Sequence, residues 1–370
     1  MRDLTLSDFP FLASLAGSAN PSDRRIWLRV ACDHFVAAAP AEPDAAARFV
    51  DAVSRQLDKA DPSTVLEAAR KLAPSPRTPP QLLAKFGSVS PEASDYVLEH
   101  GAAFTTTDLI GAIASGRRQA IAVAQRPDLD ARLISALVAR DEPEVLTALA
   151  INSRARLEGA ILLRLLRRAR MLAEDHGDQR LAESLLQRRP LPPESAVLFL
   201  LANPLQRVEI LLAAQRAQLG RPPGQPATIA PEIVEELEQA AVARRPKQFI
   251  DVLGKALECD TVLAERIADD PSGEPLAVAM AALGAPSDVL VRVLIATDLQ
   301  DGEPYRRIGA LARLNNALNR NAATAVVAAL RGEPHARRQA AAAEALASTR
   351  APALRGASRP ASAPQRKAAI

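Results

Sequence analysis

The sequence predicts an all-α protein, and three observations lead to this fold class. Alanine makes up roughly a fifth of the 370 residues, and Ala, Leu and Arg, which are all abundant here, are strong helix formers. Aromatic residues amount to only 3%, and the alternating runs of Val, Ile, Thr and Tyr that strands favour are missing. A short helical phrase also recurs: residues 122–131 read AVAQRPDLDA and residues 148–157 read ALAINSRARL. Repetition at a period of roughly 20–50 residues predicts an α-solenoid of short antiparallel helix pairs.

Proline marks the beginnings of many of the predicted helices. The chain has 29 prolines, and most lie at the edge of an apolar periodic stretch, as Pro62, Pro91 and Pro143 do. Proline is tolerated in the first helical turn because its missing N–H would have no acceptor there. Ser63 and Asp288 lie nearby as candidate N-caps. The proline spacing therefore predicts many short helices.

Apolar periodicity places helices along most of the chain. The first helix, 21–38, is expected to bury Ile26, Trp27, Val30 and Phe35. Further helices are predicted at 43–60, 62–73, 78–87, 91–99, 106–115, 117–126, 130–140, 142–151 and 156–174, two or three within 178–217, and then at 230–245, 246–258, 260–269, 274–284, 287–297, 304–315 and 319–331. Helices of two or three turns are marginal alone, so they must pack on their neighbours.

Composition divides the chain into five parts. Residues 1–20 are expected to be a leader, 21–217 an N-terminal helical-repeat domain and 229–332 a set of C-terminal helical repeats. Residues 218–228 read QLGRPPGQPAT, which predicts a loop or hinge. Residues 333–370 end in a stretch rich in Ala, Pro, Ser and basic residues, which predicts a disordered basic tail.

Charge and cysteine content exclude several classes of protein. The net charge of +3 is too small to indicate a partner by itself. Two cysteines far apart in sequence form neither a disulfide framework nor a zinc-ligand spacing, and they favour a cytoplasmic protein. The first residues lack a basic start followed by an apolar run, so no signal peptide is expected. No apolar stretch is long enough for a transmembrane segment.

Motifs that carry chemistry are also missing. The sequence contains no GxGxxG, GxxxxGK[ST] or GxSxG, so the common phosphate-binding loops and the nucleophile elbow are absent. None of the four histidines belongs to a metal-ligand spacing. Cys32 and His34 stand two residues apart on a helix, where side chains point in different directions. We therefore expect no catalytic residue, no cofactor and no metal site.

An arginine cluster is the best candidate for a binding site. The residues are Arg154, Arg156, Arg164, Arg167 and Arg168. Three of them, Arg164, Arg167 and Arg168, share one helix face, and like charges at that spacing repel mildly. Acids such as Glu158 or Glu174 could compensate them, which would make the cluster an internally paired surface. An anionic partner could also do so, which would make it a binding site.

The segment AIAVAQRPDLDARLISALVARDEPEVLTALAINSRARL (120–157) resembles an uncharacterised, mainly alphaproteobacterial family, the domain of unknown function numbered 2336. The resemblance covers 62–156 best and extends over 25–330. The family's short helices are similar to HEAT-type and leucine-rich-variant helical repeats, which implies a HEAT- or armadillo-like superhelix. The resemblance implies nothing about activity.

These observations favour a non-catalytic scaffold or adaptor that binds another protein along a helical face. Two alternatives rest on the arginine cluster: a nucleic-acid-binding HEAT-like protein, and a sensor of a phosphorylated small ligand. The sequence leaves the oligomeric state open.

Overall fold

A computed structural model describes residues 18, 20–37, 43–219, 231–297 and 304–332. All regular structure in these ranges is helical, which confirms the predicted all-α class. The predicted leader (1–20), loop (218–228) and basic tail (333–370) lie wholly or mostly outside the described residues.

The chain divides into two compact units, an N-terminal unit up to Ala213 and a C-terminal unit from Ala214. Helices of the N-terminal unit are α2 (Pro21–Ala37), α3 (Pro43–Leu57), α4 (Pro62–Leu72), α5 (Pro80–Val89), α6 (Pro91–His100), α7 (Thr106–Ser115), α8 (Arg117–Ala124), α9 (Ala131–Ala139), α10 (Pro143–Ile151), α11 (Gly159–His176), α12 (Arg180–Leu186), the 3-10 helix η2 (Pro193–Leu201) and most of α13 (Pro204–Gln218). The C-terminal unit contains α14 (Pro231–Val242), α15 (Pro246–Leu257), α16 (Thr261–Ala268), α17 (Glu274–Leu283), α18 (Ser287–Ala296), α19 (Pro304–Ala317) and α20 (Arg320–Leu330). Each predicted helix is present, with ends that shift by a few residues.

Residues that precede a first-turn proline begin several helices. Asp61 comes before Pro62, and its carboxylate accepts the N–H of Thr64 at 3.0 Å. Ser90 likewise comes before Pro91 and accepts the N–H of Ala93 at 3.3 Å. The candidate cap Ser63 was therefore wrong, because a proline at the first helical position makes the preceding residue the N-cap. Hydrogen bonds from the Ser63 and Thr64 hydroxyls and from the Thr64 N–H hold the pKa of Asp61 well below its usual range.

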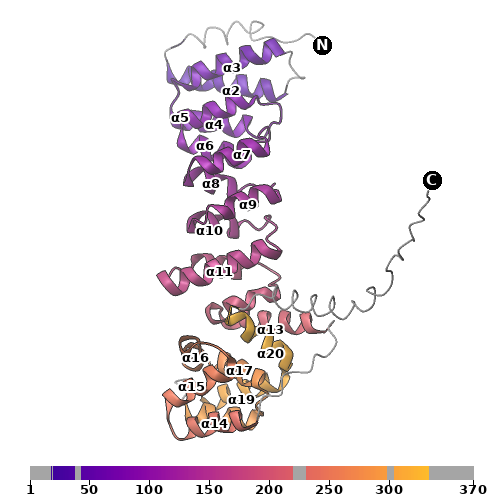
Figure 1. The fold of residues 1–370 in the computed structure, drawn as a ribbon. Helices are drawn as coiled ribbons and strands as arrows, with labels where there is room; N and C mark the ends of the chain where they lie inside the picture. The colour runs from indigo at the N-terminus through magenta and orange to yellow at the C-terminus, as the bar shows by residue number, and fades with distance from the viewer. Residues whose placement is uncertain (1–17, 19, 38–42, 220–230, 298–303, 333–370) are drawn as a thin grey trace, which may run out of the picture. The chain divides into compact units, whose positions relative to one another are not determined.

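Even-numbered helices of the N-terminal unit pack on one another in chain order. Contacts run from α2 to α4, α6, α8, α10 and α12 in turn, and the intervening helices flank this row, with α3 on α5 and α7 on α9. Figure 1 shows the same succession of helices along the unit. Each of these helices therefore packs between two others and contributes to a continuous apolar core.

The apolar core follows from this packing. Leu72, Leu83 and Phe86 are fully buried near the start of the unit. In α2 the buried residues are Trp27, Leu28, Ala31 and Cys32, whereas the predicted Ile26 and Val30 are 45% and 39% exposed. The predicted stripe was wrong at these two positions because α2 packs on α4 through a face rotated from the one that the pattern suggested.

Carbonyl groups at the C-terminal ends of the even-numbered helices are capped by the following even-numbered helix. Arg77, just after α4, donates to the Phe35 and Val36 carbonyls of α2. The Ala102 N–H donates to the Ala73 carbonyl at 2.9 Å. At each of the next three junctions a side chain donates to a helix-end carbonyl. Arg126 donates at the end of α6, Asn152 at the end of α8 and Arg188 at the end of α10. The last four carbonyls of a helix have no partner within it, so each junction supplies what the helix lacks.

Arg126 is the most buried of these capping side chains, at 3% exposure. It donates to the Leu98 carbonyl at 2.8 Å and the Gly101 carbonyl at 3.1 Å, and it forms a two-bond ion pair with Asp128. The guanidinium therefore pairs with Asp128 and also caps the end of α6 from a buried position. A cation at a helix C-terminus also interacts favourably with the helix dipole.

The C-terminal unit is built around α17, in which every residue from Pro275 to Leu283 is buried. The helices that contact it include α15, α16, α19 and α20. Side-chain caps recur here: Arg331 donates to the Leu257 carbonyl at 2.9 Å, and Arg320 to the Ala282 carbonyl at 3.2 Å. Both units therefore use arginine to satisfy helix ends.

Two further observations concern the predicted compartment and membrane topology. Cys32 is buried and Cys259 is partly buried. Burial raises the pKa of the Cys32 thiol to about 12. Among helices of the described ranges, none has the length and apolar character needed to cross a membrane.

Replacing Arg126 by methionine should destabilise the protein. The substitution keeps an unbranched apolar stem but leaves two helix-end carbonyls without donors, so the free energy of unfolding should fall by about 2–3 kcal/mol. Urea unfolding followed by circular dichroism measures this change. Arg164→Met, at an exposed position, is the matched control and should stay within about 0.5 kcal/mol of the parent protein. Equal effects of the two substitutions would show that the caps contribute nothing.

Candidate binding groove

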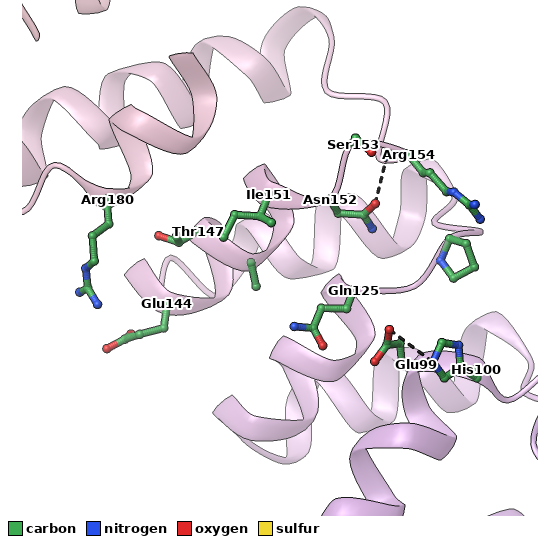
Figure 2. Close-up of a pocket in the computed structure, with 12 residues that line it drawn as sticks. Glu99, His100, Gln125, Glu144, Thr147, Ile151, Asn152, Ser153, Arg154 and Arg180 are labelled. Carbon is green, nitrogen blue, oxygen red and sulfur yellow. Dashed lines mark hydrogen bonds and ion pairs between the residues drawn. The ribbon is translucent and has the colours of Figure 1, made fainter. Parts of the chain in front are cut away.

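A groove with a volume of about 730 Å³ opens on the surface of α6, α8, α10 and α12 (Figure 2). It is lined by Glu99, His100, Gln125, Pro127, Glu144, Thr147, Ala148, Ile151, Asn152, Ser153, Arg154 and Arg180. One end lies at the C-terminal ends of α6, α8 and α10. The other end lies where α10 and α12 begin, at Glu144 and Arg180. The groove therefore crosses four helices that stack in succession.

The loop after α10 is held in place by the capping interactions. Asn152 donates through its side-chain amide to the Ala124 carbonyl at 2.9 Å and to the Arg126 carbonyl at 2.6 Å. Its side-chain oxygen accepts the N–H of Arg154 at 3.0 Å. Arg188 donates to the Ala150 and Asn152 carbonyls at 2.9 and 2.8 Å. These bonds fix the backbone that carries Ile151 and Arg154 into the groove.

Asn152 directly follows the last residue of α10, and its φ and ψ angles of −67° and 98° are extended. Its side-chain amide caps the end of α8, the preceding helix of the row, rather than the end of its own helix. Local sequence could not identify the capped helix, because the acceptor carbonyls lie 28 and 26 residues away.

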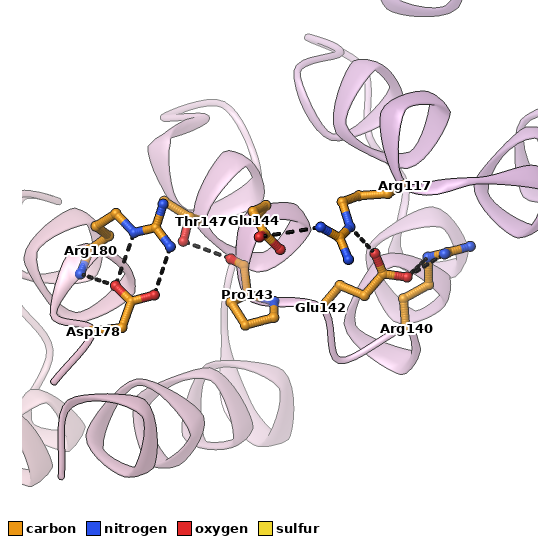
Figure 3. Close-up of polar contacts among 8 residues, drawn as sticks. All are labelled: Arg117, Arg140, Glu142, Pro143, Glu144, Thr147, Asp178 and Arg180. Atoms are coloured by element: carbon orange, nitrogen blue, oxygen red, sulfur yellow. Dashed lines mark hydrogen bonds and ion pairs between the residues drawn. The ribbon is translucent and has the colours of Figure 1, made fainter. Parts of the chain in front are cut away.

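Several polar side chains of the groove already have partners. Arg180 forms two hydrogen bonds with the carboxylate of Asp178, at 3.0 and 2.8 Å, as Figure 3 shows. Its backbone N–H also donates to Asp178, at 3.1 Å. Thr147 donates to the Pro143 carbonyl at 2.7 Å. These groups are therefore committed to the protein's own structure.

Two other polar groups of the groove are available to a ligand. Arg154 is exposed, and its guanidinium forms no ion pair or hydrogen bond within the described residues. The Glu144 side chain is 39% exposed, and within the described residues its carboxylate makes one long contact, 3.4 Å from Oε1 to Arg117 Nη1. Between them stands Ile151, which is 67% exposed. The groove thus offers a cation, an apolar side chain and an acceptor.

The predicted arginine cluster does not form one site. Of its five members, only Arg154 lines the groove. Arg168 lies 3.3 Å from the carboxylate of Asp141, measured from Nε to Oδ1. Arg156, Arg164 and Arg167 are exposed, with no ion pair within the described ranges.

Acids compensate the cluster only in part. Glu174, a predicted compensator, pairs instead with Arg170 at 2.8 Å. Asp141, which compensates Arg168, comes from the turn before α10 and was not anticipated. Helical spacing shows which arginines share a face, but it cannot show which neighbouring turn supplies an acid.

Sequence reasoning did not single out Glu144, Ile151 or Arg180. A signal was available for Ile151, because the buried residues of α10 are Val145, Leu146, Leu149 and Ala150. Ile151 follows Ala150 at the last position of the helix, and helical geometry places its side chain on a different face from these four, away from the core. Glu144 and Arg180 carry no comparable local signal.

The C-terminal unit has a second pocket of about 630 Å³, over Phe249 and Leu276 and bordered by Arg244 and Asp269. Arg244 has φ of 52°, an uncommon conformation for a residue other than glycine. No group of three or more metal-ligating His, Cys, Asp or Glu side chains occurs in the part of the chain that the structure describes.

Comparison with known proteins identifies one family. Residues 94–203 match the family model described as an uncharacterised protein conserved in bacteria (DUF2336), which confirms the predicted family resemblance over that range. The search of curated proteins and the search of solved structures gave no match. Every residue that lines the groove falls within residues 94–203. The groove is therefore a feature of the family segment.

Removing Arg180 should change the ionisation of Asp178. Hydrogen bonds from the Arg180 guanidinium and N–H lower the pKa of Asp178 to about 2, from an ordinary value of 3.8. The ionised pair therefore stabilises the fold fully above about pH 4, and this stabilisation is lost as the pH falls through 2. In Arg180→Ala, the pKa should return toward 3.8, measured by carbon NMR of the carboxyl group during an acid titration.

Arg164→Ala is the control for this titration because it removes an arginine that has no partner among the described residues. The pKa of Asp178 should stay at about 2 in that variant. A low pKa that persists in Arg180→Ala would contradict the assignment of its cause.

Proposed function

We propose that the protein is a non-catalytic helical-repeat scaffold that binds a segment of another protein in the groove on α6, α8, α10 and α12. The observation that carries the proposal is the position of the groove, which spans four successive helices of the family segment and exposes Ile151. Binding along successive repeats is how helical-repeat proteins use their extended surfaces.

The proposed architecture of the N-terminal unit is an α-solenoid of the HEAT or armadillo type. Support comes from the packing order, in which α4, α6, α8 and α10 each contact the even-numbered helices before and after them. The same capping interaction also recurs at consecutive junctions. Repetition of one unit contact is the physical basis of a solenoid, because no unit can bury its apolar face alone.

Charge in the groove favours a protein partner over a phosphorylated ligand. Arg180, the second arginine of the groove, is already neutralised by Asp178. Glu99 and Glu144 also line the groove, and they repel the roughly double negative charge of a phosphate more strongly than the single charge of one carboxylate. A partner protein can present groups of both signs together with an apolar side chain, and such a mixture matches the lining.

The proposal of a non-catalytic role is supported by the carboxylates with lowered pKa values. Asp61 caps α4, and Asp178 pairs with Arg180. Each shift has a structural cause, and neither residue forms a nucleophile–base pair of the kind that catalysis requires. The expected cytoplasmic location stays a prediction from cysteine content.

Nucleic-acid binding is the second candidate, favoured by one observation. Arg164 and Arg167 are exposed on α11, and neither has an ion pair within the described residues. A gel-shift titration at two salt concentrations tests this candidate. Binding through phosphates would weaken steeply with salt, and replacing both arginines by glutamate would abolish it.

Photo-crosslinking in cells tests the scaffold proposal. A photoreactive amino acid replaces Gln125, an exposed residue that lines the groove. Illumination should join the full chain to one partner protein, giving an adduct of defined mass. Adding Ile151→Asp should reduce the adduct by about tenfold or more, because it places a charge where an apolar contact forms.

Val262→Asp is the matched control for this experiment. Val262 is 65% exposed, close to the 67% of Ile151, but it lies on α16 of the C-terminal unit. The adduct should survive this substitution. The scaffold proposal would be rejected if no adduct formed, or if both aspartate variants reduced it equally.

A further inference from the structure

We infer that the groove binds an extended peptide segment of the partner in which an acidic residue, which pairs with Arg154, stands next to an apolar residue, which packs on Ile151. This inference rests on the proposed function and specifies the chemistry of its partner. It follows from three groups that line the groove: the Arg154 guanidinium, which is unpaired within the described residues, the exposed Ile151 side chain, and the partly exposed Glu144 carboxylate.

Arg154 supplies the positive charge. Its backbone N–H is bound by Asn152, which is itself bound to two carbonyls of the preceding repeat. The guanidinium therefore extends from a fixed point, while its charged end is exposed and unpaired in the described structure. A carboxylate matches this group in charge and in hydrogen-bond geometry.

Ile151 supplies the apolar contact. It is the last residue of α10, and in Figure 2 it lies between the Thr147 and Asn152 side chains. Ala148 and Pro127 also line the groove. A side chain of moderate size can cover this patch without entering the core.

Glu144 supplies an acceptor at the other end of α10. Its side chain is 39% exposed, and its one hydrogen bond within the described residues, from Arg117, is long at 3.4 Å. A backbone N–H of the bound segment would give this carboxylate a further hydrogen bond. A segment in extended conformation has such groups at regular intervals, whereas a helix would have used most of its own.

The helix geometry gives an approximate spacing for the bound segment. Glu144 and Ile151 are seven positions apart on α10, which corresponds to about 10 Å along the helix axis. An extended chain covers that distance in about three residues. The apolar residue that contacts Ile151 should therefore be about three residues from the N–H that reaches Glu144.

Basic segments and phosphorylated ligands fit the groove less well. A basic side chain near Arg154 would meet a like charge at the exposed end of the groove. A phosphate would need a second free cation, but the Arg180 guanidinium is held by Asp178. The combination of a free cation and a free acceptor selects a peptide with an acidic side chain and a backbone donor.

An array of ten-residue peptides tests the inference. Acidic, basic and apolar residues are varied in the array, and the full chain is the probe. Peptides with adjacent acidic and apolar residues should bind best. Arg154→Glu should weaken these peptides by about tenfold or more and should select basic peptides instead. Arg164→Glu, the same charge change at an exposed arginine outside the groove, should leave the selection unchanged.

Failure of this inference differs from failure of the proposed function. The inference is overturned if the parent protein shows no preference for acidic peptides, if Arg154→Glu keeps the parent's selection, or if no peptide binds. In each case, the crosslink from Gln125 and its loss in Ile151→Asp would still support the scaffold. Absence of that crosslink would overturn the proposed function itself.

Discussion

Capping of helix-end carbonyls by the next even-numbered helix and the residues that follow it is the interaction on which the N-terminal unit depends. The helices are short, so the unpaired carbonyls at their ends are a large fraction of their backbone acceptors. Arg126, Asn152 and Arg188 occupy equivalent places, one or two residues after their own helices, and each donates to the preceding even-numbered helix. A short helix that is marginal alone is thus completed by its neighbour, and the neighbour is placed by the same bonds.

Ion pairs between the same helices add to this arrangement. Arg118 of α8 pairs with Asp95 of α6 at 2.9 Å, and Arg117 of α8 pairs with Glu142, just before α10, at 2.9 Å. These pairs are largely exposed, so each contributes only about 0–1 kcal/mol. The apolar core and the buried caps therefore account for most of the stability, and the exposed pairs favour the correct order of packing.

The candidate groove is a consequence of the capping. Two sets of hydrogen bonds hold the loop after α10. The Asn152 side chain donates to two carbonyls at the end of α8, and the Arg188 side chain donates to the Asn152 carbonyl. Ile151 and Arg154 flank Asn152 in the sequence, so the same bonds position an apolar side chain and a cation at the surface. A structural interaction thereby fixes the geometry of a surface that the proposed partner would contact.

Local sequence was sufficient for the helices and insufficient for the site. Prolines at helix starts and the 3.6-residue apolar period depend only on neighbouring residues, so the all-α class and nearly every helix could be predicted. The apolar face of α2 and the dispersal of the arginine cluster could not be predicted, because α2 packs on the later helix α4 and Arg168 meets Asp141 from another turn. Sequence by itself determined where the backbone is helical, since that choice is local. Only the tertiary structure decided which arginines are buried caps, which are paired and which, like Arg154, remain available, because each outcome depends on groups that folding brings together from distant positions.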